Sequence, residues 1–198
     1  MDAAAVEKAK RRLERARECL TEIERPPKTY ADFQAAWTDF LLALNGIFSC
    51  LEQGAKISPQ SRQWFGGKKR TRKGDGLMQY LHQARNTEEH GIVPVSKLKT
   101  PTVKLLEGTG NPDSVKSIEI HDDRVIIVHN PSEGKSPVIS VTMPAAILVP
   151  VKDDRSGKVF DPPTEHLDQL IENSFPLTVS RLGFAYVENL IAEAEGLA

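Results

Sequence analysis

Residues 77–91 form the segment LMQYLHQARNTEEHG, whose pattern is typical of one short amphipathic helix. Asp75 precedes the segment, at a position where its side chain can accept the free N–H groups of the first turn. Gly91 follows the segment, where a left-handed cap is expected, and Pro94 prevents continuation. At about 100° per residue, four apolar side chains fall on one face: Leu77, Tyr80, Leu81 and Ala84. This face predicts packing against a core.

The polar arc of the same helix carries Arg85, Asn86 and His90. Asn86 and His90 are four residues apart and are therefore neighbours on the helix surface. An arginine, an amide and a histidine near one helix end can bind an anion such as a phosphate. The alternative is a solvated polar face whose arginine and histidine hydrogen-bond locally.

The arrangement Arg85-Asn86-x-x-x-His90 resembles the R-x(4–6)-H motif of the HEPN superfamily, in which the residue after the arginine is often Asn, Asp or His. HEPN domains are bundles of four to five helices with this motif near a helix end. Two features differ from the family pattern. Residues 87–89 are polar where relatives often carry apolar residues, and Ile92 stands where one subset carries a modified tyrosine.

Composition limits the classes of partner. The chain has 198 residues, 39% of them hydrophobic and 27% charged, as in a globular domain. Its net charge of −1 implies that any polyanionic partner meets a local basic patch. No apolar run approaches membrane-spanning length and no secretory signal is recognisable, so we expect a cytoplasmic protein without membrane contact.

Three further segments have helical patterns: residues 3–24, 30–53 and 178–195. The second has the clearest periodicity, with apolar residues recurring at steps of three and four: Tyr30, Phe33, Trp37, Phe40, Leu44, Ile47 and Leu51. Pro26 and Pro27 separate the first two segments, so an antiparallel helical hairpin is expected.

Residues 56–74 are basic throughout, with no Asp or Glu, and two aromatic residues and four glycines lie within or beside this stretch. We interpret them as a loop that meets the nucleic-acid backbone. The candidate nucleic-acid-binding residues are Trp64, Lys68, Lys69, Arg70, Arg72 and Lys73. The alternative is a solvated loop with Trp64 tucked into the helices. The stretch lacks the Gly-x4-Gly-Lys-Ser/Thr pattern of a phosphate-binding loop.

After Pro94 the pattern changes to short β-branched runs. Strands are expected over residues 116–121, 124–129, 137–142, 146–152 and 158–160, with a turn at Asp122-Asp123. A further helical stretch is expected over 165–173, with His166 on the surface. The fold class is therefore α+β: a four-helix HEPN-like bundle (1–95 plus 162–198), with a small antiparallel β-meander (96–161) inserted before the last helix.

The resemblance implies a metal-independent RNA endonuclease in which the RNA 2′-hydroxyl attacks the adjacent phosphate. His90 would transfer protons, Arg85 would hold the phosphate, and Asn86 would orient either His90 or the phosphate. Because one histidine does not serve easily as both base and acid, a homodimer is expected. Such enzymes commonly act in toxin or phage-defence settings.

The alternative function is a non-catalytic module that binds a nucleotide, nucleic acid or a partner protein. No cofactor is expected. No metal site is expected either, because His82, Glu89 and His90 converge poorly on one helix and no H-E-x-x-H motif is present.

Overall fold

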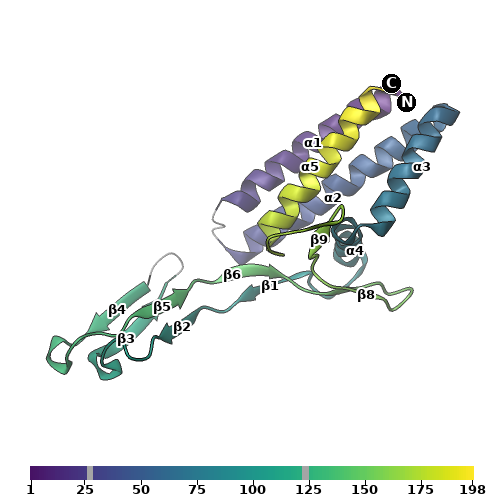
Figure 1. Cartoon of the computed structure of the whole chain (residues 1–198). Helices are drawn as coiled ribbons and strands as arrows, with labels where there is room; N and C mark the ends of the chain where they lie inside the picture. The colour runs from purple at the N-terminus through teal and green to yellow at the C-terminus, as the bar shows by residue number, and fades with distance from the viewer. Residues whose placement is uncertain (26–28, 122–124) are drawn as a thin grey trace. The chain divides into compact units, whose positions relative to one another are not determined.

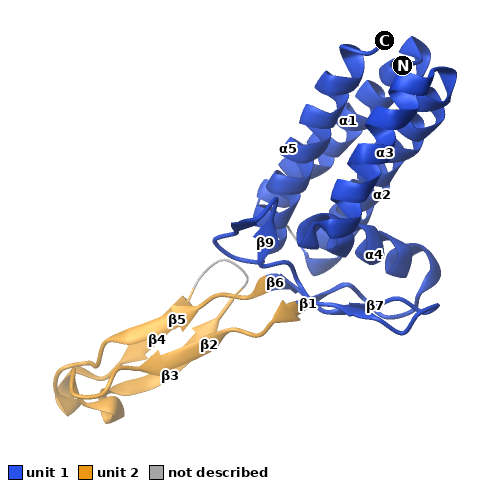
Figure 2. Ribbon diagram, turned by 45° about the vertical axis from the view of Figure 1, so that its right-hand side comes forward, with its two compact units in different colours: residues 1–97, 146–198 blue, residues 98–145 orange. Residues whose placement is uncertain are grey.

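The computed structural model describes residues 1–25, 29–121 and 125–198 and has the predicted α+β class (Figure 1). The proline stop at Pro26-Pro27 and the turn at Asp122-Asp123 lie outside the described residues. The chain divides into two compact units, residues 1–97 with 146–198 and residues 98–145 (Figure 2). The assignment of 1–95 with 162–198 to one domain and 96–161 to another stays a prediction.

The first unit contains the helices. Four of them occupy the segments that were expected to be helical: α1 (Ala3–Glu24), α2 (Tyr30–Gly54), α4 (Gly76–His90) and α5 (Pro176–Glu195). A further helix, α3 (Pro59–Gly74), follows the short 3-10 turn η1 (Ala55–Ile57) and forms where a loop was expected. The described part of the chain therefore has five α-helices.

The aromatic stripe of α2 lies at the centre of the helical core. Phe33, Trp37 and Phe40 are each at most 5% exposed and stack in sequence, with ring centroids 6.3 and 6.1 Å apart. α1 contributes small buried side chains, Ala9 and Ala16, and it packs on both α2 and α5. Burial of this apolar surface is the main favourable contribution to the stability of the unit.

The two ends of the chain and the end of α2 meet at one end of the helices (Figure 1). The Met1 amino group donates to the carbonyl of Leu197, and the Asp2 N–H donates to the carbonyl of Gly54 at 3.1 Å.

Gly183 lies in α5 where this helix approaches α4 closely. A Cβ there would lie 2.7 Å from Cδ1 of Leu81 on α4. Glycine therefore lets α4 pack directly on α5.

Two small hairpins complete this unit: β7 (Val151–Lys152) with β8 (Val159–Phe160), and β9 (Glu165–His166) with β10 (Gln169–Leu170). The expected helix over 165–173 is therefore wrong. Leu167 and Asp168 both have positive φ, 49° and 62°, as in a two-residue hairpin turn. Most of β9 and β10 is exposed, so a helix here would have no buried face to stabilise it.

The remaining strands form nested pairs, so the predicted meander topology is wrong. β1 (Ser96–Lys99) pairs with β6 (Ala145–Leu148), and β2 (Thr102–Leu105) pairs antiparallel with β5 (Ile139–Thr142). Only β3 (Val115–Ile120) and β4 (Val125–His129) are consecutive partners here, and the 3-10 turns η2 (Pro112–Ser114) and η3 (Pro131–Glu133) flank them. β1 and β2 were not predicted from the sequence, because they are largely exposed, contain lysines and lack a β-branched apolar run.

Candidate functional site

Asp75 holds the start of α4. Its Oδ1 accepts the N–H of Met78 at 2.7 Å, which is the predicted N-cap bond. Its Oδ2 accepts the N–H of Leu167 at 2.7 Å, and Nδ1 of His166 lies 3.1 Å from both carboxylate oxygens. Burial opposes the charged carboxylate, but these contacts prevail and hold the pKa of Asp75 below its ordinary value. His166 is therefore an ion-pair partner with 11% of its side chain exposed, rather than a surface residue.

The apolar stripe of α4 is buried as predicted. Leu77, Tyr80 and Ala84 have no exposed surface, and Leu81 is 4% exposed. The Tyr80 hydroxyl donates to the carbonyl of Val149 at 2.8 Å. This hydrogen bond satisfies the Tyr80 hydroxyl, which is the one polar side-chain group of the buried stripe. Because the buried stripe fixes the rotation of α4 about its axis, the polar face on the opposite side also has a defined orientation.

The end of α4 differs from the prediction. Gly91 has φ −97° and ψ 172°, which is extended backbone, and not the left-handed cap that was expected. Its N–H donates to the carbonyl of Thr87 at 2.7 Å. A Cβ at this position would lie 2.7 Å from that same oxygen. The glycine is therefore required for a close approach of the chain and not for a positive φ.

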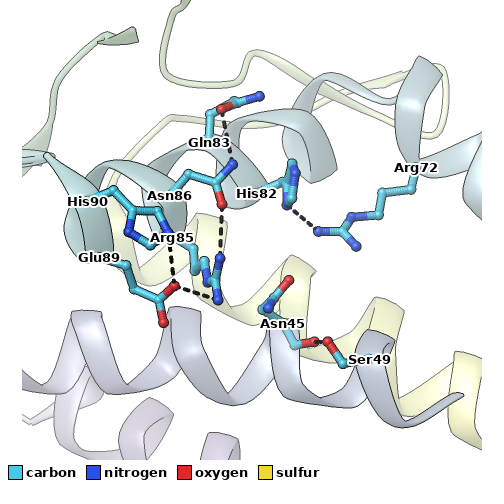
Figure 3. Close-up of polar contacts among 9 residues, drawn as sticks. All are labelled: Asn45, Ser49, Arg72, His82, Gln83, Arg85, Asn86, Glu89 and His90. Atoms are coloured by element: carbon cyan, nitrogen blue, oxygen red, sulfur yellow. Dashed lines mark hydrogen bonds and ion pairs between the residues drawn. The ribbon is translucent and has the colours of Figure 1, made fainter. Parts of the chain in front are cut away.

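Arg85, Asn86 and Glu89 form one connected polar group on α4 (Figure 3). Arg85 donates from Nη1 to Oδ1 of Asn86 at 3.1 Å, and its Nη2 lies 2.5 Å from Oε2 of Glu89. Asn86 donates in turn to Oε1 of Gln83 at 3.4 Å. The side chains of Arg85 and Glu89 are only 22% and 29% exposed. Arg85 and Asn86 thus lie together, and Glu89 compensates the arginine charge.

His90 lies at the outer edge of this group. Its side chain is 73% exposed, and its Nε2 is 3.8 Å from Oε2 of Glu89. Asn86 makes its hydrogen bonds to Arg85 and Gln83, so it orients the arginine rather than the histidine. The three predicted catalytic residues are therefore on one helix end, with His90 connected to Arg85 through Glu89 (Figure 3).

The basic segment is a helix, which corrects the loop interpretation. Ser58 caps α3 by accepting the N–H of Ser61 at 3.1 Å, and Pro59 occupies the first turn. Gly66 and Gly67 lie inside the helix, where glycine is disfavoured by about 1 kcal/mol each relative to alanine. This penalty and the lack of an apolar stripe concealed the helix. Packing of Phe65, which is 7% exposed, stabilises it instead.

Three of the predicted nucleic-acid-binding residues contact carboxylates of the protein itself. Lys68 and Trp64 both contact the carboxylate of Glu193, at 2.6 Å and 3.0 Å. The hydrogen bond from Lys68 is the main reason why the pKa of Glu193 lies below its ordinary value. Lys69 pairs with Glu52 at 2.6 Å. Trp64 is consequently partly buried and packed on the core rather than free to stack on a base.

Arg70 and Lys73 are exposed on α3, whereas Arg72 faces inward. Nη2 of Arg72 lies 2.7 Å from Nδ1 of His82, and the two side chains point toward one another from α3 and α4 (Figure 3). The Arg72 guanidinium also lies over the Phe48 ring, 4.0 Å from its centroid. Arg72 therefore does not share the exposed surface of Arg70 and Lys73.

His82 is the site residue that sequence analysis missed. Burial, followed by the charges of Arg72 and Arg85, lowers its pKa to about 4, so its neutral ring accepts from Arg72. Burial also lowers the pKa of Arg72, to about 10, which leaves it charged at neutral pH. His82 precedes Asn86 by one helical turn, and this spacing alone only weakly indicates that His82 belongs to the same site. Its partner is Arg72, which lies on α3 in the segment that was expected to be a loop.

No protein-family model, curated protein or solved structure matches this chain. Across residues 1–25, 29–121 and 125–198, no helix is long and apolar enough to cross a membrane. Within the same ranges, no three His, Cys, Asp or Glu side chains gather in a way that could hold a metal ion.

The Arg72–His82 contact predicts a pH-dependent stability. Between pH 6.5 and about 4 the unfolded chain binds a proton at His82 that the folded protein does not, so the free energy of unfolding should rise with pH across this window. His82→Gln, which keeps an acceptor for Arg72, should lose this contribution. Urea unfolding of both proteins at several pH values measures the difference. The exposed His90→Gln serves as the matched control, and a wild-type-minus-His82→Gln difference that does not vary with pH would contradict the assignment.

Proposed function

We propose that this protein is a metal-independent RNA endonuclease that resembles the HEPN ribonucleases, with Arg85, Asn86 and His90 at the cleavage site. The observation that carries the proposal is the pairing of Arg85 with Asn86 on one turn of α4, beside an exposed His90 at the end of the same helix. An oriented guanidinium and an accessible imidazole are the two groups that phosphodiester cleavage by a 2′-hydroxyl requires.

In the proposed reaction the 2′-oxygen attacks the adjacent phosphorus as a base removes its proton. The bond from phosphorus to the 5′-oxygen breaks, and that oxygen takes up a proton. The products are a 2′,3′-cyclic phosphate and a 5′-hydroxyl. Arg85 would exchange Glu89 for the phosphate and stabilise the charge that develops there. Asn86 would act as a positioning residue through its hydrogen bond to Arg85.

A homodimer would supply the second proton-transfer group, because removal of one proton and delivery of another are separate tasks. The surface next to His90 favours association at this end of α4. Ile92 is fully exposed and Val93 is 68% exposed, directly after the helix. Apolar side chains that protrude beside a polar site commonly become covered by a partner. Two copies related by a two-fold axis would bring two His90 side chains to one site.

The RNA backbone would run along the exposed basic side of α3. Arg70 and Lys73 are the exposed predicted contacts that lack a bond to a carboxylate in the described structure. Lys68 and Lys69 would have to exchange Glu193 and Glu52 for phosphate, which reduces their net contribution. A toxin or phage-defence setting is part of the proposal through the family resemblance.

The wild-type protein should cut RNA in excess EDTA and spare DNA of the same sequence, because the nucleophile is the 2′-hydroxyl. His90→Ala should slow cleavage on the order of 10²–10⁴-fold through loss of proton transfer. Arg85→Ala should also cripple cleavage, while His121→Ala, an exposed histidine of the other unit, should not. The measurement is formation of 2′,3′-cyclic phosphate from a mixed RNA pool. Equal traces of product from wild type and His90→Ala, or loss of activity in chelator, would favour the non-catalytic binding module instead.

Salt dependence tests the RNA-binding surface separately. Arg70→Ala with Lys73→Ala should weaken RNA binding and lower the slope of log K against log salt concentration by about 1–2, because each phosphate contact releases counterions. Fluorescence anisotropy with a short RNA at several salt concentrations measures this slope. Lys8→Ala with Arg11→Ala removes the same charge from the exposed side of α1. An equal loss of affinity in both double variants would show that only the overall charge matters.

A further inference from the structure

A cavity of about 400 Å³ is lined by residues of α2, α3 and α4 and by Phe160 of β8. Its volume is within the range of pockets that hold small organic ligands. Arg72 and His82 line it, whereas Arg85, Asn86 and His90 do not. The cavity is therefore a site separate from the proposed cleavage residues, although other residues of α4 line it.

Arg72 gives the cavity a positive charge that lacks a carboxylate partner. Its nearest polar contact is the neutral ring of His82 at 2.7 Å, and among the described residues no carboxylate oxygen lies within 4.0 Å of its guanidinium nitrogens. The nearby charge of Arg85 repels it and lowers its pKa further. A half-buried cation ordinarily has an anionic partner. The missing partner is therefore an anion that can enter the cavity.

The other cations of the cavity point to the same kind of ligand. Lys73 is exposed at its edge and has no ion pair with a described residue. Lys69 is compensated by Glu52, which is also the only acidic residue among those that line the cavity. The cavity thus keeps an excess of positive charge, and an arginine with free N–H donors matches the geometry of a phosphate.

The walls fit an aromatic group as well as an anion. Phe160 is a partly exposed ring in the lining, whereas Phe48, which lies under the Arg72 guanidinium, and Phe65 are only 5% and 7% exposed. Flat aromatic rings stack favourably on an accessible ring such as Phe160. Gln79 and Gln83 line the same cavity and carry amide donors and acceptors that can meet the edge of a heterocyclic base.

We propose that this cavity binds a nucleoside phosphate, with the phosphate on Arg72 and Lys73 and the base against Phe160. The phosphate supplies the anion that Arg72 lacks, and the base accounts for the aromatic lining. The site does not depend on RNA cleavage by His90.

Isothermal titration of the full-length protein tests the proposal with six probes: AMP, GMP, CMP, UMP, adenosine and inorganic phosphate. At least one monophosphate should bind at one site per chain with Kd below about 1 mM. Adenosine and inorganic phosphate should each bind about tenfold more weakly or worse, because each lacks one half of the recognised group. His90→Ala should bind like the wild type, so failure of the cleavage proposal leaves this result intact.

Two variants locate the site. Arg72→Gln should weaken binding about tenfold or more, while Arg62→Gln, an exposed arginine of the same helix, should leave it unchanged. Ser49→Met projects a larger side chain into the cavity from an exposed position of α2 and should also abolish binding without removing a charge. Absence of binding by all four monophosphates, binding of phosphate alone with equal affinity, or unchanged affinity in Ser49→Met would each overturn the proposal.

Discussion

The buried carboxylate of Asp75 is the constraint on which the site depends. It caps α4, accepts the N–H of Leu167 and pairs with His166, so one side chain ties the start of the helix to the β9–β10 hairpin. With 7% exposure it has almost no access to water, and its charge is stable only because these donors replace the lost hydration. Once this end of α4 is held, every later residue of the helix has a determined direction.

Because α4 is held in this direction, its two histidines lie in different environments. His82 turns toward Arg72 of α3, where burial keeps its ring neutral. Arg85 and Asn86 follow one turn later and are hydrogen-bonded to one another, and Glu89 pairs with Arg85. His90 ends the helix in solvent. The imidazole of His82 is buried and neutral whereas that of His90 is exposed, and for this reason we propose proton transfer for His90 and ligand contact for the cavity beside His82.

Sequence analysis located α1, α2, α4 and α5 because their apolar residues recur with helical spacing, and the Asp75 cap marked the start of α4. It also placed Arg85, Asn86 and His90 on one helix end, since positions on a single helix follow from spacing alone. It missed α3 because paired glycines and basic side chains conceal a helix that packs mainly through Phe65. His82 and the nested strands β1 and β2 were missed for a related reason: their partners come from distant segments, and no local pattern specifies them.

The central claim is that the cleavage site is completed by two copies of His90. Heterodimers that contain one wild-type and one His90→Ala subunit, purified through two different tags, test it most directly. The account predicts that such heterodimers cleave RNA on the order of 10²-fold or more slower than the wild-type homodimer, because one of the two proton-transfer groups is missing. A heterodimer with half of the wild-type rate would contradict the claim, since each subunit would then act alone.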